Sequence, residues 1–210
     1  MLAAAMSLYA MIEGGYGIEC DVVANTRAQA KILFDMCAAI SRRMDPKKRY
    51  LRQTINRVKF DKTESFIWVL ASEAASLDGY GSYFYVEDEF HAAPDTKLFD
   101  VLASSQGARH NPLSVIVTTA GYNLTGPYYT EIRKGLIDML EGVVENDSLF
   151  GLIYTLDEGD DYHDKSVWPK VNPNLGITVS ESYVEDRINN IKTNPLSEID
   201  VITKTFNCWV

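Results

Sequence analysis

Along the first three quarters of the chain, hydrophobic residues recur in two patterns, one typical of helices and one typical of strands. Apolar residues three or four positions apart predict amphipathic helices; they occur at 2–12, 33–40, 98–102 and 132–140. Short stretches in which apolar residues alternate with polar ones or follow one another predict strands; they occur at 20–25, 55–60, 66–70, 83–86, 114–117 and 149–156. Thr26, with Gln29 three residues later, forms a capping box that predicts the start of the second helix.

This alternation predicts an α/β protein with a mostly parallel central sheet flanked by helices. Beyond residue 156 the composition changes. An acidic segment at 157–164 precedes a loop rich in Pro and Asn, and Ser180 predicts the cap of a short helix. The last residues, 206–210, form an apolar, strand-like run. We therefore predict a core over residues 1–156 and a smaller subdomain over residues 157–210.

Charge narrows the range of functions. The 210 residues include 20 Lys and Arg against 29 Asp and Glu, which gives a net charge of −9. This acidic balance argues against a protein that binds nucleic acid with its whole surface. A basic cluster surrounds Pro46 and is interpreted as the solvated end of the second helix, where the helix dipole favours cations. The cluster comprises Arg42, Arg43 and residues 47–49.

Cysteine and histidine are sparse, with three residues of each type and no metal-binding spacing. No CxxC pair occurs, so a zinc site is not expected, and scattered thiols suit a reducing compartment. The apolar start has no basic region before it and reaches Glu13 too soon for a membrane span. We expect neither a signal peptide nor a membrane helix.

The strongest chemical signal is the apolar run at 83–86, which leads into Glu87, Asp88 and Glu89. Ligands of open α/β sheets bind at the carboxyl ends of the strands, and an acidic pair there is the Walker B pattern of nucleotide hydrolases. Asp88 would hold Mg²⁺ through its water shell, and Glu89 would deprotonate the water that attacks the γ-phosphate. The alternative is that these acids stand where a strand simply emerges into solvent.

A second polar strand end follows one helix later. The run at 114–117 ends in Thr118 and Thr119, and hydroxyls beside a Walker B strand can contact the γ-phosphate and respond to its loss. Alone, the two threonines also fit a simple turn. The phosphate-binding pattern GxxxxGK[ST] does not occur in the sequence, and the glycines at 14–17 are interpreted as a helix stop.

Seven segments, in order along the chain, resemble the large terminase subunits of tailed phages: 22–34, 76–79, 86–92, 107–113, 118–122, 153–160 and 168–176. The resemblance implies a P-loop NTPase-like core of the ASCE or RecA type. It also implies that the core is truncated at its N-terminus, because the family's phosphate-binding loop immediately precedes the helix that here begins at Met1. Residues from Asp157 would form the lid and linker toward a nuclease domain beyond Val210.

The resemblance also implies roles for individual residues. Asp88 would be the Walker B acid that binds Mg²⁺ indirectly, and Glu89 would be the catalytic acid. Thr118 and Thr119 would belong to the motif that couples ATP hydrolysis to DNA movement.

Three further residues are nucleotide-binding candidates by the same resemblance. Arg27 and Gln29 lie in the segment that such motors place near the nucleotide. Some relatives carry an arginine finger where this chain has Asp78 and Gly79, which makes Arg109 a candidate for that role; the alternative for Arg109 is a surface residue beside a turn.

The intact protein is thereby expected to hydrolyse ATP with Mg²⁺ and to move viral double-stranded DNA into the procapsid. Its expected partners are DNA, the portal protein and the small terminase subunit, in the cytoplasm of an infected or lysogenic bacterium. A ring oligomer is expected only on the portal. Because the phosphate-binding loop is missing, the isolated chain is expected to bind ATP weakly or not at all.

Two other function classes stay open. The first is a non-catalytic prophage relic or interaction module that only docks to the portal or the small subunit. The second is a metal-dependent hydrolase with ligands from Glu87, Asp88, Glu89 and His91. Alternate residues of a strand face opposite sides, so Asp88 does not easily converge with Glu87 and Glu89. For His91, a hydrogen bond within the catalytic site is favoured over a ligand role.

Overall fold

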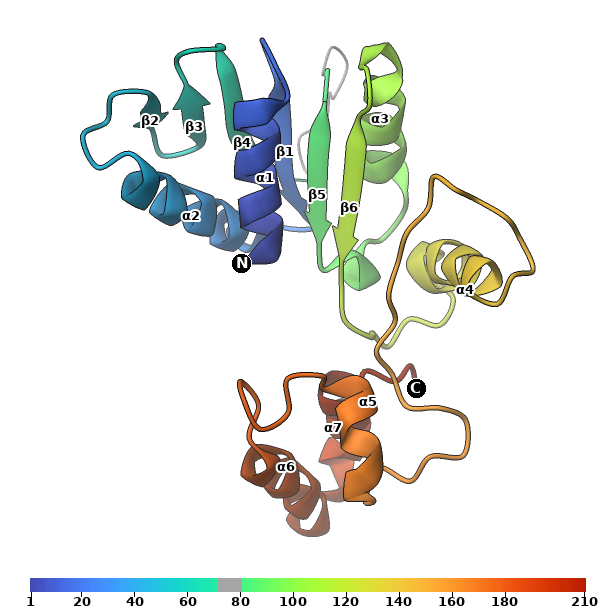
Figure 1. Ribbon diagram of the computed structural model, residues 1–210. Helices are drawn as coiled ribbons and strands as arrows, with labels where there is room; N and C mark the ends of the chain where they lie inside the picture. Colours follow the sequence, from blue (N-terminus) through green and yellow to red (C-terminus); the bar gives the residue numbers. More distant parts are fainter. Residues whose placement is uncertain (72–80) are drawn as a thin grey trace. The chain divides into compact units, whose positions relative to one another are not determined.

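The computed structural model describes residues 1–71 and 81–210. The chain divides into two compact units, unit 1 over Met1–Thr118 and unit 2 over Thr119–Val210 (Figure 1). The resemblance segment at 76–79, with Asp78 and Gly79, lies outside the described residues. This division follows Thr118, whereas the sequence predicted a boundary after residue 156. The boundary at 156 between core and subdomain stays a prediction.

Unit 1 is built on a six-stranded sheet with the order β2-β3-β4-β1-β5-β6. β1 pairs in parallel with β4 and β5, and β5 pairs in parallel with β6. The prediction of a mostly parallel α/β sheet is thus confirmed. The strands are β1 (Glu19–Ala24), β2 (Leu51–Gln53), β3 (Arg57–Phe60), β4 (Ser65–Ala71), β5 (Phe84–Asp88) and β6 (Leu113–Val117).

β2 and β3 depart from the parallel arrangement, because β2 pairs antiparallel with β3, and β3 pairs antiparallel with β4. Only four residues separate the end of β3 from the start of β4. Parallel neighbours need a crossover of about a dozen residues or more, so a connection this short can only make a hairpin.

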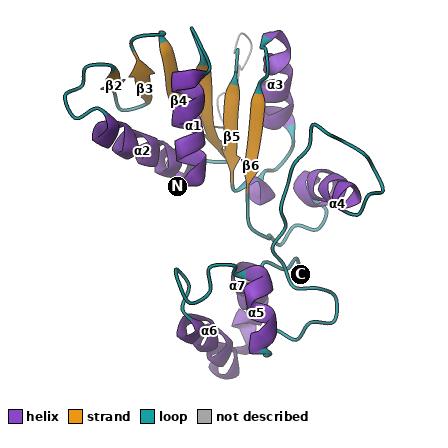
Figure 2. Ribbon diagram, in the orientation of Figure 1, coloured by secondary structure: helices purple, strands orange, loops and turns teal. Residues whose placement is uncertain are grey.

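Helices cover both faces of the sheet (Figure 2). α1 (Leu2–Glu13) and α2 (Arg27–Met44) pack on the face that holds Val22 and Val86, and α3 (Lys97–Ser105) packs on the face that holds Val23 and Tyr85. α2 begins as predicted, because the Thr26 hydroxyl accepts the backbone N–H of Gln29 at 3.3 Å. Short 3-10 turns, η1 (Phe90–Ala92) and η2 (Gln106–Ala108), follow β5 and α3.

Unit 2 is helical in its described residues, with α6 capped by Ser180 as predicted. Its helices are α4 (Lys134–Leu140), preceded by a π-helical turn at Tyr128–Arg133, α5 (Trp168–Val171), α6 (Glu181–Thr193) and α7 (Glu198–Phe206), with 3-10 turns at Lys165–Val167 and Pro195–Ser197. Trp168, Val184, Val201 and Phe206 form the centre of its apolar core. None of the helices that the structure describes is both long and apolar enough to cross a bilayer.

Two predicted strands in this unit are wrong. Residues 149–156 are irregular, and Phe150 is 84% exposed. The 206–210 run begins with the last residue of α7, which ends at Asn207 in a left-handed conformation. An apolar run becomes a strand only where a neighbouring strand accepts its backbone hydrogen bonds, and the described part of the chain gives neither segment such a neighbour.

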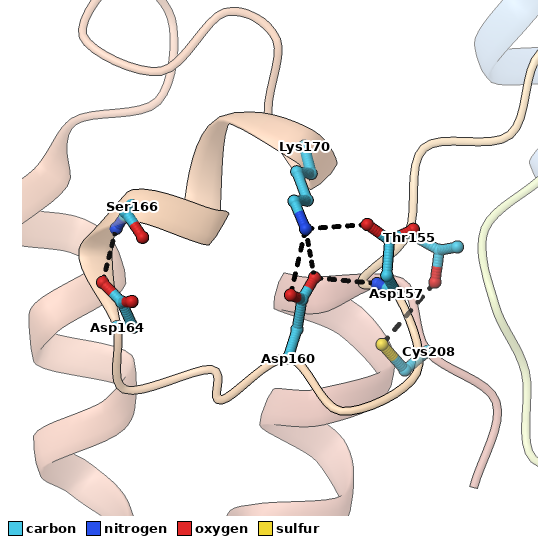
Figure 3. A network of polar contacts seen from close by, with 7 residues as sticks. All are labelled: Thr155, Asp157, Asp160, Asp164, Ser166, Lys170 and Cys208. Atoms are coloured by element: carbon cyan, nitrogen blue, oxygen red, sulfur yellow. Dashed lines mark hydrogen bonds and ion pairs between the residues drawn. The ribbon is translucent and has the colours of Figure 1, made fainter.

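Lys170 pairs with two carboxylates of the acidic segment of unit 2 (Figure 3). The Lys170 ammonium contacts Asp157 at 2.7 Å and Asp160 at 2.8 Å, and it lowers the pKa of Asp160. Asp164 caps the next turn by accepting the backbone N–H of Ser166 at 2.9 Å. These contacts account for Asp157, Asp160 and Asp164 as parts of an ordered loop.

The face of the sheet that packs against α3 contains two buried carboxyl groups, Asp21 on β1 and Glu87 on β5. Burial is the main cause that raises the pKa of each carboxyl to about 7. Trp68 donates its indole N–H to Asp21, but Asp21 Oδ2 and Glu87 Oε2 have no hydrogen-bond partner among the residues that the structure describes. Ionising these groups therefore opposes folding.

The pH dependence of stability follows from the raised pKa of Glu87. An unfolded glutamate ionises near pH 4.3, so the stability that depends on protonated Glu87 is present below that pH and is lost as the pH rises through 7. Glu87→Gln should therefore raise the free energy of unfolding at pH 8, by about 2 kcal/mol, and change it much less at pH 5. Urea denaturation at both values measures this. Glu13→Gln, at an exposed position, is the matched control, and equal effects of Glu87→Gln at the two pH values would contradict the prediction.

Candidate functional site

The acidic sequence after residue 86 lies at the carboxyl end of β5, between the ends of β1 and β6. Phe84 and Val86 face the core formed with α1 and α2, whereas Tyr85 faces α3. Since successive side chains of a strand alternate, Asp88 shares the face of Val86 and Glu87 shares the face of Tyr85. The two adjacent acids therefore point to opposite sides of the sheet. Glu87, which is 2% exposed, is separated from Asp88 by the strand itself.

Asp88 lines a small cavity of about 120 Å³ at the amino end of α1. Burial and the nearby Glu89 carboxylate raise its pKa above the usual range for aspartate. The first N–H groups of a helix have no acceptor within the helix, and the helix dipole makes this end attractive to anions. An acid of the type that binds cations and a helix end that favours anions thus border one cavity. The other lining residues are Met1, Ala3, Ile32, Leu33, Met36 and Val117.

Glu89 stands where the chain turns from β5 into η1. Its backbone adopts the left-handed conformation, with φ 57° and ψ 40°. This costs a residue with a side chain roughly 1–2 kcal/mol relative to the right-handed region, and strained residues cluster at functional sites. The Glu89 N–H donates to the carbonyl of Val117 at 2.9 Å, which fixes the end of β5 against the end of β6.

His91 connects the Glu89 carboxylate to Thr118. The His91 ring Nδ1 lies 3.1 Å from Glu89 Oε2 and 2.9 Å from Thr118 Oγ1. The backbone N–H of His91 also donates to Thr118 Oγ1, at 3.0 Å. The His91 side chain is only 12% exposed. The interpretation of His91 as a hydrogen-bonding residue of this site agrees with these contacts.

The start of α2 holds two further predicted residues and adjoins the Glu89 turn. Arg27 and Gln29 form the first turn of α2, and the Gln29 side chain bonds to the Thr26 hydroxyl at 3.1 Å. Just before them, the Asn25 amide donates to the backbone carbonyl of Glu89 at 3.5 Å, so that the start of α2 adjoins the Glu89 turn. Sequence reasoning missed Asn25. A polar residue at the end of a strand next to β5 was the signal available.

Arg109 is not brought to Asp88 and Glu89. The Arg109 guanidinium donates to the carbonyl of Gly81 at 2.7 Å, and Gly81 precedes β5. Arg109 therefore lies at the amino end of the parallel strands, opposite the acidic cluster. Thr119 is the first residue of unit 2, where its hydroxyl contacts the carbonyl of Ala120 at 3.3 Å.

The residues present fit a magnesium ion accompanied by phosphate. Within residues 1–71 and 81–210, no three His, Cys, Asp or Glu side chains gather closely enough to hold a metal by themselves. Mg²⁺ is commonly bound by one or two carboxylates together with waters and phosphate oxygens. A single carboxylate in a small cavity beside a helix amino end matches that donor set.

Two family models match the chain. One, described as the terminase large subunit ATPase domain, matches residues 1–135, and the other, described as the terminase large subunit endonuclease domain, matches residues 143–210. The second match includes all of the region interpreted from the sequence as lid and linker. The sequence analysis expected the endonuclease domain beyond Val210, whereas this family model matches residues that precede Val210.

Curated relatives include a protein named as a terminase large subunit. The Escherichia coli K12 protein YmfN is 37% identical over 153 residues, which cover 73% of this chain and 33% of that protein. The terminase large subunit of Lactococcus phage p2 is 26% identical over 174 residues, which cover 79% of this chain and 31% of that protein. The chain thus spans about a third of the length of these relatives.

Solved structures share the fold. The large terminase of bacteriophage HK97 superposes with a TM-score of 0.84 at 19% identity, covering 99% of this chain and 43% of that one. A large terminase from a thermophilic bacteriophage, in complex with ADP, superposes with a TM-score of 0.61 at 12% identity, covering 100% and 44%. These matches confirm the P-loop NTPase-like fold class predicted from the sequence.

The left-handed backbone of Glu89 leads to a prediction about stability. Glu89→Gly and Glu89→Ala both remove the contact with His91, but only glycine adopts this conformation without a steric cost. The glycine variant should therefore be more stable than the alanine variant, by about 1 kcal/mol, in urea denaturation. At Asp88, which lies in β5, the order of the two variants should reverse. An alanine variant at position 89 as stable as the glycine variant would contradict the strained conformation.

Proposed function

The chain belongs to the terminase large subunit family, and we propose from this premise that unit 1 supplies the acidic side of an ATP-hydrolysing site in a phage DNA-packaging motor. The observation that supports the proposal is the placement of Asp88 and Glu89 at one strand end. Asp88 faces the cavity at the amino end of α1, and Glu89 contacts His91. Two adjacent acids with separate surroundings suit two separate tasks.

In this proposal, Asp88 would hold the magnesium ion of MgATP through water, and a bound ion would supply neutralisation of the phosphate charge. Glu89 accepts a proton from the attacking water. His91 orients the Glu89 carboxylate through Nδ1, and Thr118 holds His91 through both its ring and its backbone N–H. The first turn of α2, with Arg27 and Gln29, adjoins the Glu89 turn through Asn25, and in the proposal it would border the nucleotide.

The proposal includes the partners that the family membership suggests: viral double-stranded DNA, the portal protein and the small terminase subunit, in the cytoplasm of a bacterial host. Thr119 would lie in the coupling motif, directly after Thr118. Arg109 would act as an arginine finger only toward a site other than the one beside Asp88, because it lies at the opposite end of the strands. The 210 residues contain no GxxxxGK[ST] pattern, so this chain by itself should bind ATP weakly.

Nucleotide binding can be tested on the chain as it stands. Titration with MgATP, followed by two-dimensional NMR of backbone amides, should shift resonances around Asp88, Glu89 and Ala3, with a Kd in the millimolar range (about −4 kcal/mol). Asp88→Asn should abolish the part of the response that requires Mg²⁺. Asp95→Asn removes an exposed acid of the same unit and serves as the control. Shifts that are confined to other regions, or a magnesium dependence that survives in Asp88→Asn, would contradict the proposed site.

The role of Glu89 can be tested wherever a preparation of this protein hydrolyses MgATP. Glu89→Gln keeps the size of the side chain but removes the base, so turnover should fall by about 10² to 10⁴ while nucleotide binding persists. The control is Glu87→Gln, the same substitution two residues earlier, which should leave turnover within about twofold of the original protein because Glu87 faces α3. Equal losses in both variants would instead favour a metal-binding acidic cluster.

A further inference from the structure

Positive charge is concentrated in one short part of the chain. Residues 42–62 contain nine Lys and Arg and two Asp, a net charge of +7, whereas the other 189 residues contain 11 basic and 27 acidic residues, a net charge of −16. The net charge of the whole chain therefore hides a strongly basic segment. A segment with this sign attracts a polyanion that the rest of the surface repels.

The fold gathers this segment at one edge of unit 1. It runs from the last turn of α2 through a turn at 45–50 into β2 and β3, and β2 is the edge strand opposite β6 (Figure 1). Asp45 is the acid inside the turn. Its carboxylate accepts the backbone N–H groups of Tyr50 at 2.7 Å and Leu51 at 2.9 Å, which lowers its pKa. Asp45 thus holds the turn in shape.

Some cations of the segment have partners within the protein. Arg52 pairs with Asp61, and Lys59 pairs with Glu64 at 2.5 Å. The other seven are exposed and have no ion-pair partner among the residues that the structure describes. Arg42 bonds to the Gln53 side chain at 3.3 Å, and Arg57 and Lys62 lie over aromatic rings. The remaining four lie together around the turn; these are Arg43, Lys47, Lys48 and Arg49. We call these four residues the basic turn. Their charges are available to an anion at no cost in broken ion pairs.

Two cations of the segment 42–62 cover aromatic rings. The Lys62 ammonium lies 4.2 Å from the centre of the Tyr50 ring. The Arg57 guanidinium lies 4.6 Å from the ring of Phe66 and 4.7 Å from the ring of Trp68. Binding of single-stranded nucleic acid depends on open aromatic faces on which bases stack. Because these rings are covered, bases cannot stack on them. The exposed cations therefore favour contact with the phosphate backbone of a duplex.

We propose that the basic turn binds the phosphate backbone of double-stranded DNA without reading its sequence. The choice of duplex DNA rests on the proposed function, and the location rests on the charge distribution and the exposed side chains. The sequence analysis interpreted this cluster as a solvated helix end. The turn instead extends beyond α2, has a fixed shape and carries cations that form no ion pair within residues 1–71 and 81–210.

The test is fluorescence anisotropy of a labelled 20-base-pair duplex, titrated with the full chain at several salt concentrations. The triple variant Lys47→Gln, Lys48→Gln, Arg49→Gln should weaken binding at least tenfold at 50 mM salt. It should also reduce the slope of log K against log salt by about 2 to 3, since each lost phosphate contact removes about 0.9. The single variant Arg49→Gln should reduce the slope by about 1.

The matched control is Lys97→Gln, Lys134→Gln, Lys192→Gln, which removes the same total charge from exposed positions elsewhere. It should bind the duplex within about twofold of the original chain, because these lysines lie outside the basic turn. Surface ion pairs such as those of Lys97 and Lys134 contribute little to stability, so the control variant should fold. Urea midpoints of both triple variants verify this.

Several outcomes would overturn the proposal. They are equal weakening by the two triple variants, unchanged binding by the basic-turn variant, absence of duplex binding by the original chain at 50 mM salt, and tighter binding of a single strand of equal length. None of these outcomes alters the magnesium-dependent NMR response of Asp88. A failure of the basic turn can therefore be distinguished from a failure of the proposed nucleotide site.

Discussion

The parallel register of β1, β5 and β6 is the constraint on which the candidate site depends. Ala24, Asp88 and Val117 are aligned across the three strands, so the residues that follow them emerge at one level. The hydrogen bond from the Glu89 N–H to the Val117 carbonyl carries this alignment one residue beyond β5. A slip of β5 by one residue would exchange the faces of Glu87 and Asp88 and would bury the acid that the cavity now exposes.

The same register places neighbouring carboxyl groups in very different surroundings. Asp88 borders a cavity, and Glu89 has an imidazole partner. Glu87, one position earlier than Asp88, lies in an apolar face, and one of its oxygens has no hydrogen-bond partner in the described part of the chain. A buried carboxyl of this kind is retained only because the packing around it outweighs the cost of ionisation. Nothing in the described structure explains why position 87 is a glutamate.

The elements that could be predicted from the sequence are those whose pattern is local. The capping box at Thr26, the strand that leads into Asp88 and the helix of α3 each carry their own signal. β2 could not be predicted, because a three-residue strand gives too short a pattern. The run at 55–60 does predict β3, but not its antiparallel pairing. The strand predicted at 149–156 is wrong although its pattern is long enough. Its composition suits a strand, but the described structure supplies no neighbouring strand. The position of Arg109 depends on a contact with Gly81, 28 residues away along the chain, which no local pattern reveals.

α2 links the two regions to which we assign function. Its first turn follows Asn25, which bonds to the carbonyl of Glu89, and its last turn leads into the basic turn. A helix of 18 residues is a continuous rod of about 27 Å, packed against β1 and β4. A displacement of the Glu89 turn that moved the start of α2 would therefore also move its carboxyl end, since hydrogen bonds along the helix resist bending and stretching. The nucleotide site and the DNA surface that we propose are thus built on opposite ends of one rigid element, which gives a direct mechanical connection between them within unit 1.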